Sequence, residues 1–222
     1  ERRQGAIPGL VRADVHHDPI GVVGLIAPWN YPLTLVVSDA LPALVAGNAV
    51  VCKPAEKTTH VAAYARKLLV KAGVPPDLFQ LVPGRGPEVG PPLIERVDYV
   101  AFTGSTAVGR EVAALAGENL VPVSMELGGK NPLVVLDDAD PEAAAEGAVR
   151  SCFANAGQLC ITTERLFVDE SVYEPFRDAF VDAVEDLRLG FDYDWHAEMG
   201  PLLSEAQFEK TREHVADARE RG

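Results

Sequence analysis

The chain has 222 residues, of which 47% are hydrophobic, so it can form one large domain or two small ones around packed cores. No apolar run approaches the roughly eighteen residues that a membrane-spanning helix needs, and no apolar signal segment follows the charged N-terminal residues. Its 3 cysteines are too few for a disulfide scaffold. A cytoplasmic protein without a membrane partner is expected.

The net charge of −13 is unevenly distributed along the chain. Residues 1–130 carry 12 basic and 12 acidic side chains, whereas residues 131–222 carry 8 basic and 21 acidic ones. Such acidity argues against a nucleic-acid partner. We interpret it as solvated helix faces, while adaptation to high salt is the alternative that the ratio of 6 Lys to 14 Arg suits.

Short β-branched runs alternate with helical periodicity through the first two thirds of the chain. The clearest helical pattern spans 58–72, with Thr58 or Thr59 as the expected cap and Gly73 at the end. Alternating strands and helices predict an α/β fold with a doubly wound, mainly parallel, Rossmann-like sheet. The expected strands are 21–27, 49–53, 78–82, 99–102, 121–126 and 132–136.

Helices are also expected after residue 130. Asp140 precedes a proline and so predicts a helix start, segment 171–174 has the pattern of a capping box, and Ser204 precedes a last helix. The glycine pair at 128–129, where the charge balance changes, is the expected domain boundary.

Two glycine-rich segments are candidates for a phosphate-binding loop. In segment 84–90, Val89 stands where a dinucleotide fingerprint needs its third glycine, and Pro87 interrupts the motif. Because Gly and Pro mark loops, a turn is expected there. Gly104 and Ser105 lie between a strand and a helix, where backbone N–H groups can hold a pyrophosphate. An ordinary turn is the equal alternative on spacing alone.

Lys53 and Glu56 follow an expected strand, and ligands of open α/β sheets gather at the carboxyl ends of strands. Both side chains can bond a ribose. Taken alone, however, an ordinary surface ion pair is the simpler interpretation.

Three residues have the chemistry of a covalent thiol enzyme. The Cys160 thiol can attack a carbonyl, the Asn30 amide can hold the resulting oxyanion, and the Glu126 carboxylate can activate water. Cys52 and Cys152 are instead expected to be buried as small apolar side chains. The 5 histidines lack the spacing of a zinc site, so no metal is expected.

Five motifs, in this order and spacing, resemble the aldehyde dehydrogenase superfamily over nearly the whole chain. The sequence around Cys160 is similar to succinate-semialdehyde and related dehydrogenases. The motifs are Pro28-Trp29-Asn30, Lys53-Pro54-Ala55-Glu56, Phe102-Thr103-Gly104-Ser105, Glu126-Leu127-Gly128-Gly129-Lys130 and Gly157-Gln158-Leu159-Cys160.

The resemblance implies a catalytic role for each of the three residues. Cys160 would attack a small aldehyde to give a thiohemiacetal, whose oxyanion the Asn30 side chain and the Cys160 backbone N–H would bind. Hydride transfer to a nicotinamide would leave a thioester, and Glu126 would deprotonate the water that releases the carboxylic acid.

The resemblance also implies a cofactor site. Lys53 and Glu56 would hold the adenosine ribose, with Gly104, Ser105 and Trp29 near the pyrophosphate. Because a carboxylate accepts a hydrogen bond from the ribose 2′-OH and repels a 2′-phosphate, Glu56 favours NAD over NADP, with NADP still possible.

The resemblance further implies a partial NAD(P)-binding domain over 1–129 and a partial catalytic domain over 130–222. Members of the family are roughly twice as long, so this chain is expected to be a central fragment, inactive alone, of a homo-oligomeric parent. Two alternatives stay open: a CoA-acylating relative, which Glu126 argues against, and a non-catalytic nucleotide-binding fragment. A cofactor-free cysteine hydrolase is disfavoured because no histidine lies near the thiol in sequence.

Overall fold

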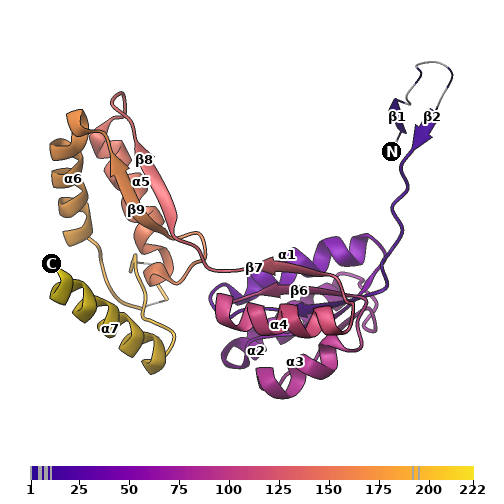
Figure 1. Ribbon diagram of the computed structural model, residues 1–222. Helices are drawn as coiled ribbons and strands as arrows, with labels where there is room; N and C mark the ends of the chain where they lie inside the picture. Colours follow the sequence, from indigo (N-terminus) through magenta and orange to yellow (C-terminus); the bar gives the residue numbers. More distant parts are fainter. Residues whose placement is uncertain (1, 5–6, 8–9, 11, 192, 195) are drawn as a thin grey trace. The chain divides into compact units, whose positions relative to one another are not determined.

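The computed structural model describes residues 2–4, 7, 10, 12–191, 193–194 and 196–222. The chain divides into two compact units, Glu1–Leu127 and Gly128–Gly222 (Figure 1). In the first unit, a short antiparallel pair, β1 (Arg2–Gln4) and β2 (Arg12–Asp14), precedes the main sheet.

The main sheet has five parallel strands in the order β5-β4-β3-β6-β7. The strands alternate with helices along the chain, which is the arrangement that parallel pairing requires. The predicted doubly wound α/β fold is therefore confirmed. The elements are β3 (Val22–Ile26), α1 (Pro32–Val45), β4 (Ala49–Lys53), η1 (Glu56–Thr58), α2 (Thr59–Lys71), β5 (Phe79–Leu81), α3 (Gly86–Ile94), β6 (Tyr99–Thr103), α4 (Thr106–Glu118) and β7 (Val123–Glu126).

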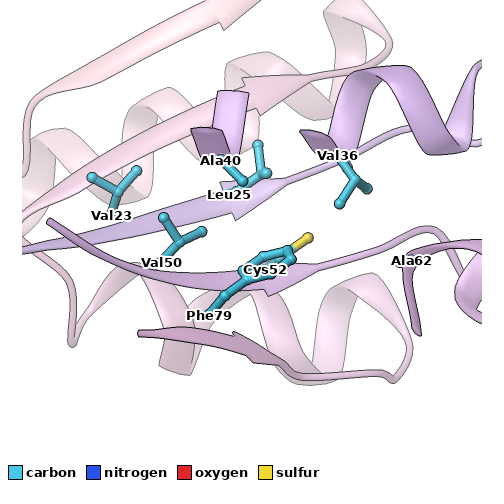
Figure 2. Close-up of a cluster of buried hydrophobic side chains, with 9 residues drawn as sticks. Val23, Leu25, Val36, Ala40, Val50, Cys52, Ala62 and Phe79 are labelled. Carbon is cyan, nitrogen blue, oxygen red and sulfur yellow. The ribbon is translucent and has the colours of Figure 1, made fainter. Parts of the chain in front are cut away.

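Each face of this sheet packs against its own pair of helices. Leu25 and Cys52 point to one face with residues of α1 and α2, while their neighbours Ile26 and Val51 contact residues of α3 and α4 on the other. This alternation follows from the two-residue period of a strand. Figure 2 shows the first core, in which Phe79 is fully buried. Burial raises the pKa of Cys52 to about 12, in agreement with the predicted structural role.

The second unit has a two-stranded parallel sheet, and one apolar core lies between this sheet and two helices. Val135 and Phe176 are its largest buried side chains. The elements are β8 (Asn131–Val135), α5 (Pro141–Phe153), η2 (Ala154–Gly157), β9 (Thr163–Val168), η3 (Glu170–Val172), α6 (Tyr173–Glu185) and α7 (Glu205–Arg221).

Several local predictions are confirmed. The Asp140 carboxylate accepts a hydrogen bond from the Ala143 N–H at 2.9 Å and caps α5. Gly73 closes α2 with a φ of +106°, which suits glycine because it has no Cβ. Ser204 precedes α7 as expected.

Other local predictions were wrong. Segment 84–90 is not simply a turn, because α3 begins at Gly86; Pro87 occupies its first turn, where a missing N–H costs no helical bond. Thr58 occupies the N-cap position of α2 as predicted, but its side chain forms no capping hydrogen bond, and the Thr59 hydroxyl donates to the Ala55 carbonyl at 3.1 Å.

Two further corrections concern the second unit. Ser171 does not cap α6, which begins only at Tyr173 with Val172 before it. The Asp169 carboxylate instead caps η3, where it accepts from the Ser171 N–H at 3.0 Å. Cys152 is partly exposed rather than buried.

We predict that Phe79→Ala destabilises the protein by about 3–5 kcal/mol, because it removes a large side chain from a filled core. The free energy of unfolding, measured with urea, checks this. Tyr64→Ala on α2 is the control, because Tyr64 is 59% exposed and should change stability by no more than about 0.5 kcal/mol. Equal effects of the two substitutions would contradict the assigned core.

Candidate functional site

The parallel strands of the first unit end at a common edge of the sheet. Ile26 pairs with both Lys53 and Phe102, and Thr103 pairs with Glu126. The carboxyl ends of neighbouring parallel strands form the usual ligand-binding edge of an open α/β sheet. The structure therefore gathers the predicted site residues of this unit at the expected edge, since each ends or follows one of these strands.

Lys53 and Glu56 form a fixed polar pair at this edge. The Lys53 Nζ lies 3.2 Å from the Glu56 Oε1, which also accepts a hydrogen bond from the Gly86 N–H at 2.8 Å. The Lys53 side chain is only 7% exposed, whereas that of Glu56 is 51% exposed. Burial opposes ionisation of Glu56, but backbone N–H groups, including that of Gly86, and the Lys53 ammonium together lower its pKa.

The pair borders a pocket of about 360 Å³ between α3 and α4. Its walls are largely apolar and include Ile94, Phe102 and Leu115, while Lys53 and Glu56 supply a hydrogen-bond donor and an acceptor. A flat apolar group carrying hydroxyls, such as a nucleoside, matches this combination of surfaces.

Gly104 and Ser105 connect β6 to α4. The Ser105 hydroxyl accepts from the Val108 N–H at 3.4 Å and caps the helix, and the Gly104 N–H donates to the Glu126 carbonyl at 3.0 Å. A Cβ on Gly104 would lie 2.6 Å from the Phe102 ring, so only glycine fits at this close approach. The helix N-terminus that follows is suited to an anion.

Trp29 and Asn30 lie between β3 and α1, and both are partly buried. The Asn30 Oδ1 accepts a hydrogen bond from the Tyr31 N–H at 3.1 Å. Because the oxygen end of the amide is held in this way, the nitrogen is the end of this side chain suited to an oxyanion.

Glu126 ends β7 and is exposed, and it borders a cavity of about 340 Å³ together with Asp39 of α1. Burial and the Glu126 carboxylate raise the pKa of Asp39. Among the described residues lining this cavity there is no Lys, Arg or His to offset the two negative charges.

Cys160 belongs to the second unit and lies in a turn between η2 and β9, partly exposed. The three residues that enter the turn, Asn155, Ala156 and Gly157, have φ values of 51°, 55° and 72°. A left-handed alanine is strained, and strain of this kind persists only where the surroundings fix it. Asn30 and Glu126 belong to the first unit, and the structure describes each unit by itself.

Within the described part of the chain, no group of three or more His, Cys, Asp or Glu side chains is placed to hold a metal ion. Nor is any of the described helices long and apolar enough to cross a bilayer.

The aldehyde dehydrogenase family model matches residues 5–222. The chain belongs to this family. It is 49% identical over 222 residues to a Mycolicibacterium smegmatis protein named "Putative succinate-semialdehyde dehydrogenase, NADP(+)", covering all of this chain and 43% of that relative. A 2-aminomuconic semialdehyde dehydrogenase of Mus musculus is 42% identical over 206 residues, which are 92% of this chain and 42% of that relative.

Solved structures of the family are also similar. An NAD+ complex of a Bacillus cereus aldehyde dehydrogenase has a TM-score of 0.91 and 38% identity. The match covers all of this chain and 46% of the Bacillus cereus chain. Succinate-semialdehyde dehydrogenase of Burkholderia pseudomallei has a TM-score of 0.88 and 41% identity. The match covers 92% of this chain and 43% of the Burkholderia chain. The chain thus spans less than half the length of these relatives.

Three contributors to these sites were missed from sequence. The Gly86 N–H contacts Glu56, which lies 30 positions earlier in the chain, and the Asp39 carboxyl lies near the still more distant Glu126. Asn131 of β8 donates a hydrogen bond to the Cys160 carbonyl. Only Asn131 left a signal, because it directly follows the glycine motif that contains Glu126.

We predict that Asp39→Asn stabilises the full-length protein at neutral pH. Folding raises the pKa of the Asp39 carboxyl. The stability of the folded protein therefore falls as the pH increases from the unfolded pKa, near 3.9, through the higher folded pKa. The gain from Asn should therefore be complete above the folded pKa and vanish below about pH 4. Urea unfolding across this range checks it, with exposed Asp138→Asn as control. A gain independent of pH would contradict the assignment.

Proposed function

We propose that the full-length protein containing this chain oxidises aldehydes to carboxylic acids with NAD(P)+. The observation that carries the proposal is the position of Cys160, on a strained and hydrogen-bonded turn, in a chain that belongs to the aldehyde dehydrogenase family. A nucleophile held in one geometry reacts faster than a mobile one.

In the first step the Cys160 thiolate adds to the aldehyde carbon, and the carbonyl oxygen becomes an alkoxide. The Asn30 amide nitrogen and the Cys160 backbone N–H are the proposed donors to this oxygen. Fixed donors of this type contribute about 2.7–4 kcal/mol each to transition-state stabilisation.

The proposed cofactor site is the pocket beside Lys53 and Glu56. Its apolar walls suit an adenine, and the carboxylate and ammonium suit the hydroxyls of a ribose. The Ser105-capped start of α4, with Gly104 and Trp29, is the proposed pyrophosphate site. When bound, the nicotinamide supplies the hydride acceptor that turns the thiohemiacetal into a thioester.

Hydrolysis completes the proposed reaction. Glu126 takes a proton from water, the resulting hydroxide attacks the thioester carbonyl, and the carbon–sulfur bond breaks. The carboxylic acid leaves, and Cys160 returns to its thiolate form.

We further propose that residues 1–129 serve cofactor binding and residues 130–222 carry the nucleophile. A cytoplasmic homo-oligomer acting on a small aldehyde fits the family and the sparse cysteines. Succinate semialdehyde is the first substrate to test, because that name recurs among the relatives.

We predict that Cys160→Ala lowers aldehyde-dependent NAD(P)H formation by the full-length protein by more than about 1,000-fold, because it removes the nucleophile. Absorbance assays over a panel of aldehydes check this. Cys152→Ala is the matched control, because this partly exposed thiol lies on α5 and should leave activity intact. Equal rates for wild type and Cys160→Ala would remove the thiol mechanism.

We predict that the wild-type protein turns over NAD faster than NADP, because Glu56 repels a 2′-phosphate. Removing that charge with Glu56→Gln should shift the ratio of kcat/KM values toward NADP by about tenfold. Glu88→Gln is the control, because this exposed carboxylate on α3 pairs with Arg85. The mycobacterial relative is named for NADP(+), so a strong NADP preference in the wild type would defeat this inference.

A further inference from the structure

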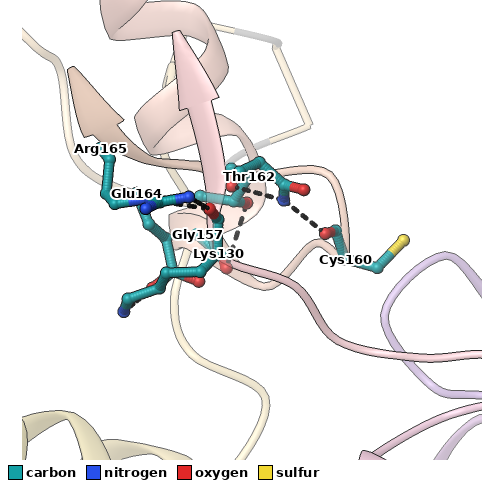
Figure 3. Close-up of polar contacts among 7 residues, drawn as sticks. Lys130, Gly157, Cys160, Thr162, Glu164 and Arg165 are labelled. Atoms are coloured by element: carbon teal, nitrogen blue, oxygen red, sulfur yellow. Dashed lines mark hydrogen bonds and ion pairs between the residues drawn. The ribbon is translucent and has the colours of Figure 1, made fainter. Parts of the chain in front are cut away.

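Asn131, the first residue of β8, ties the turn that carries Cys160 to the sheet of the second unit. Its side-chain Nδ2 donates two hydrogen bonds, to the Cys160 carbonyl at 2.7 Å and to the Thr162 carbonyl at 2.9 Å. Figure 3 labels Cys160 and Thr162 and marks the hydrogen bonds as dashed lines. One amide nitrogen thus holds two carbonyls that lie two residues apart, so the intervening backbone is constrained to one turn.

Further hydrogen bonds hold the same turn, most of them between its own residues. The Thr162 hydroxyl donates to the Gly157 carbonyl at 3.2 Å, and Thr162 is 7% exposed. The Gln158 side chain donates to the Asn155 carbonyl at 2.9 Å and accepts from the Leu203 N–H at 3.0 Å. One Asn131 hydrogen bond, at 2.7 Å, joins the Cys160 carbonyl itself to β8.

Asn131 is itself held in place. The carbonyl of the preceding residue, Lys130, accepts from the Arg165 Nε and Nη2 at 3.1 and 2.8 Å. A Cβ on Gly129 would lie 2.9 Å from the Asn131 Oδ1, so a side chain at position 129 would displace the amide. The backbone next to Asn131 is therefore fixed, and the Asn131 side chain extends from it to the Cys160 turn.

We propose that Asn131 is a positioning residue for the nucleophile. By holding the Cys160 carbonyl, Asn131 restricts the ψ angle of Cys160. This restriction helps to set the direction of both the thiol and the Cys160 N–H. The inference rests on the proposed function, because it assigns the fixed turn a role in attack on the aldehyde and in oxyanion binding.

The kinetic test uses the full-length protein with Asn131→Ala and Asn131→Ser. We expect Asn131→Ala to lower kcat about 10- to 100-fold, with KM values for aldehyde and cofactor changed by less than about threefold, because misplacement affects the chemical step. Asn131→Ser keeps one donor and should give an intermediate kcat. Glu164→Gln is the matched control, because it removes a nearby exposed ion pair with Lys130 and should keep the wild-type kcat.

A second measurement keeps the inference testable apart from turnover. Hydrogen exchange of the peptide spanning 157–162 should become at least about tenfold faster in both Asn131 variants, while exchange in β3 and β6 stays unchanged. Unchanged exchange in 157–162, or a kcat for Asn131→Ala equal to that of wild type, would overturn the inference. If the wild-type protein oxidises no aldehyde, the proposed function itself fails. The exchange data then show only whether the Asn131 hydrogen bonds hold the turn at 157–162.

Discussion

The parallel register of β3, β4, β6 and β7 is the constraint on which the first unit depends. Because Ile26 pairs with both Lys53 and Phe102, and Thr103 with Glu126, the four strands end together. Every connection must then leave the sheet from this edge and return through a helix. Polar residues placed directly after each strand consequently meet at one edge, although up to a hundred positions separate them in the chain.

The pairing at this edge also explains how a nearly buried lysine is tolerated. An ammonium without a partner is costly to remove from water, and the Glu56 carboxylate offsets that cost while the Gly86 N–H orients the carboxylate. Glu56 itself remains half-exposed. The arrangement therefore leaves a charged, oriented acceptor beside an apolar pocket, as the proposed cofactor site requires.

Local signals in the sequence predicted what depends on local physics. Strand runs, the helix over 58–72 and the Asp140 cap are confirmed because burial period and capping act within a few residues. The start of α3 was missed because its prolines suggest a turn, yet a proline in the first turn is compatible with a helix. The partners of Glu56, Asp39 and Asn131 could not be predicted, because tertiary packing alone brings them together.

The contacts of Glu56 and Asn131 have one feature in common: a polar side chain forms hydrogen bonds with backbone groups of a distant segment. The Asn48 Oδ1 accepts from the Ile20 and Gly21 N–H groups at 2.7 and 3.0 Å, and thereby joins the end of α1 to the start of β3. The Asn131 amide does the same for two carbonyls of the Cys160 turn. Each bond satisfies a backbone group that is costly to leave unpaired, so each segment has one favoured position. Fixed backbone is what oxyanion stabilisation requires, since donors that must reorganise during reaction stabilise the transition state less.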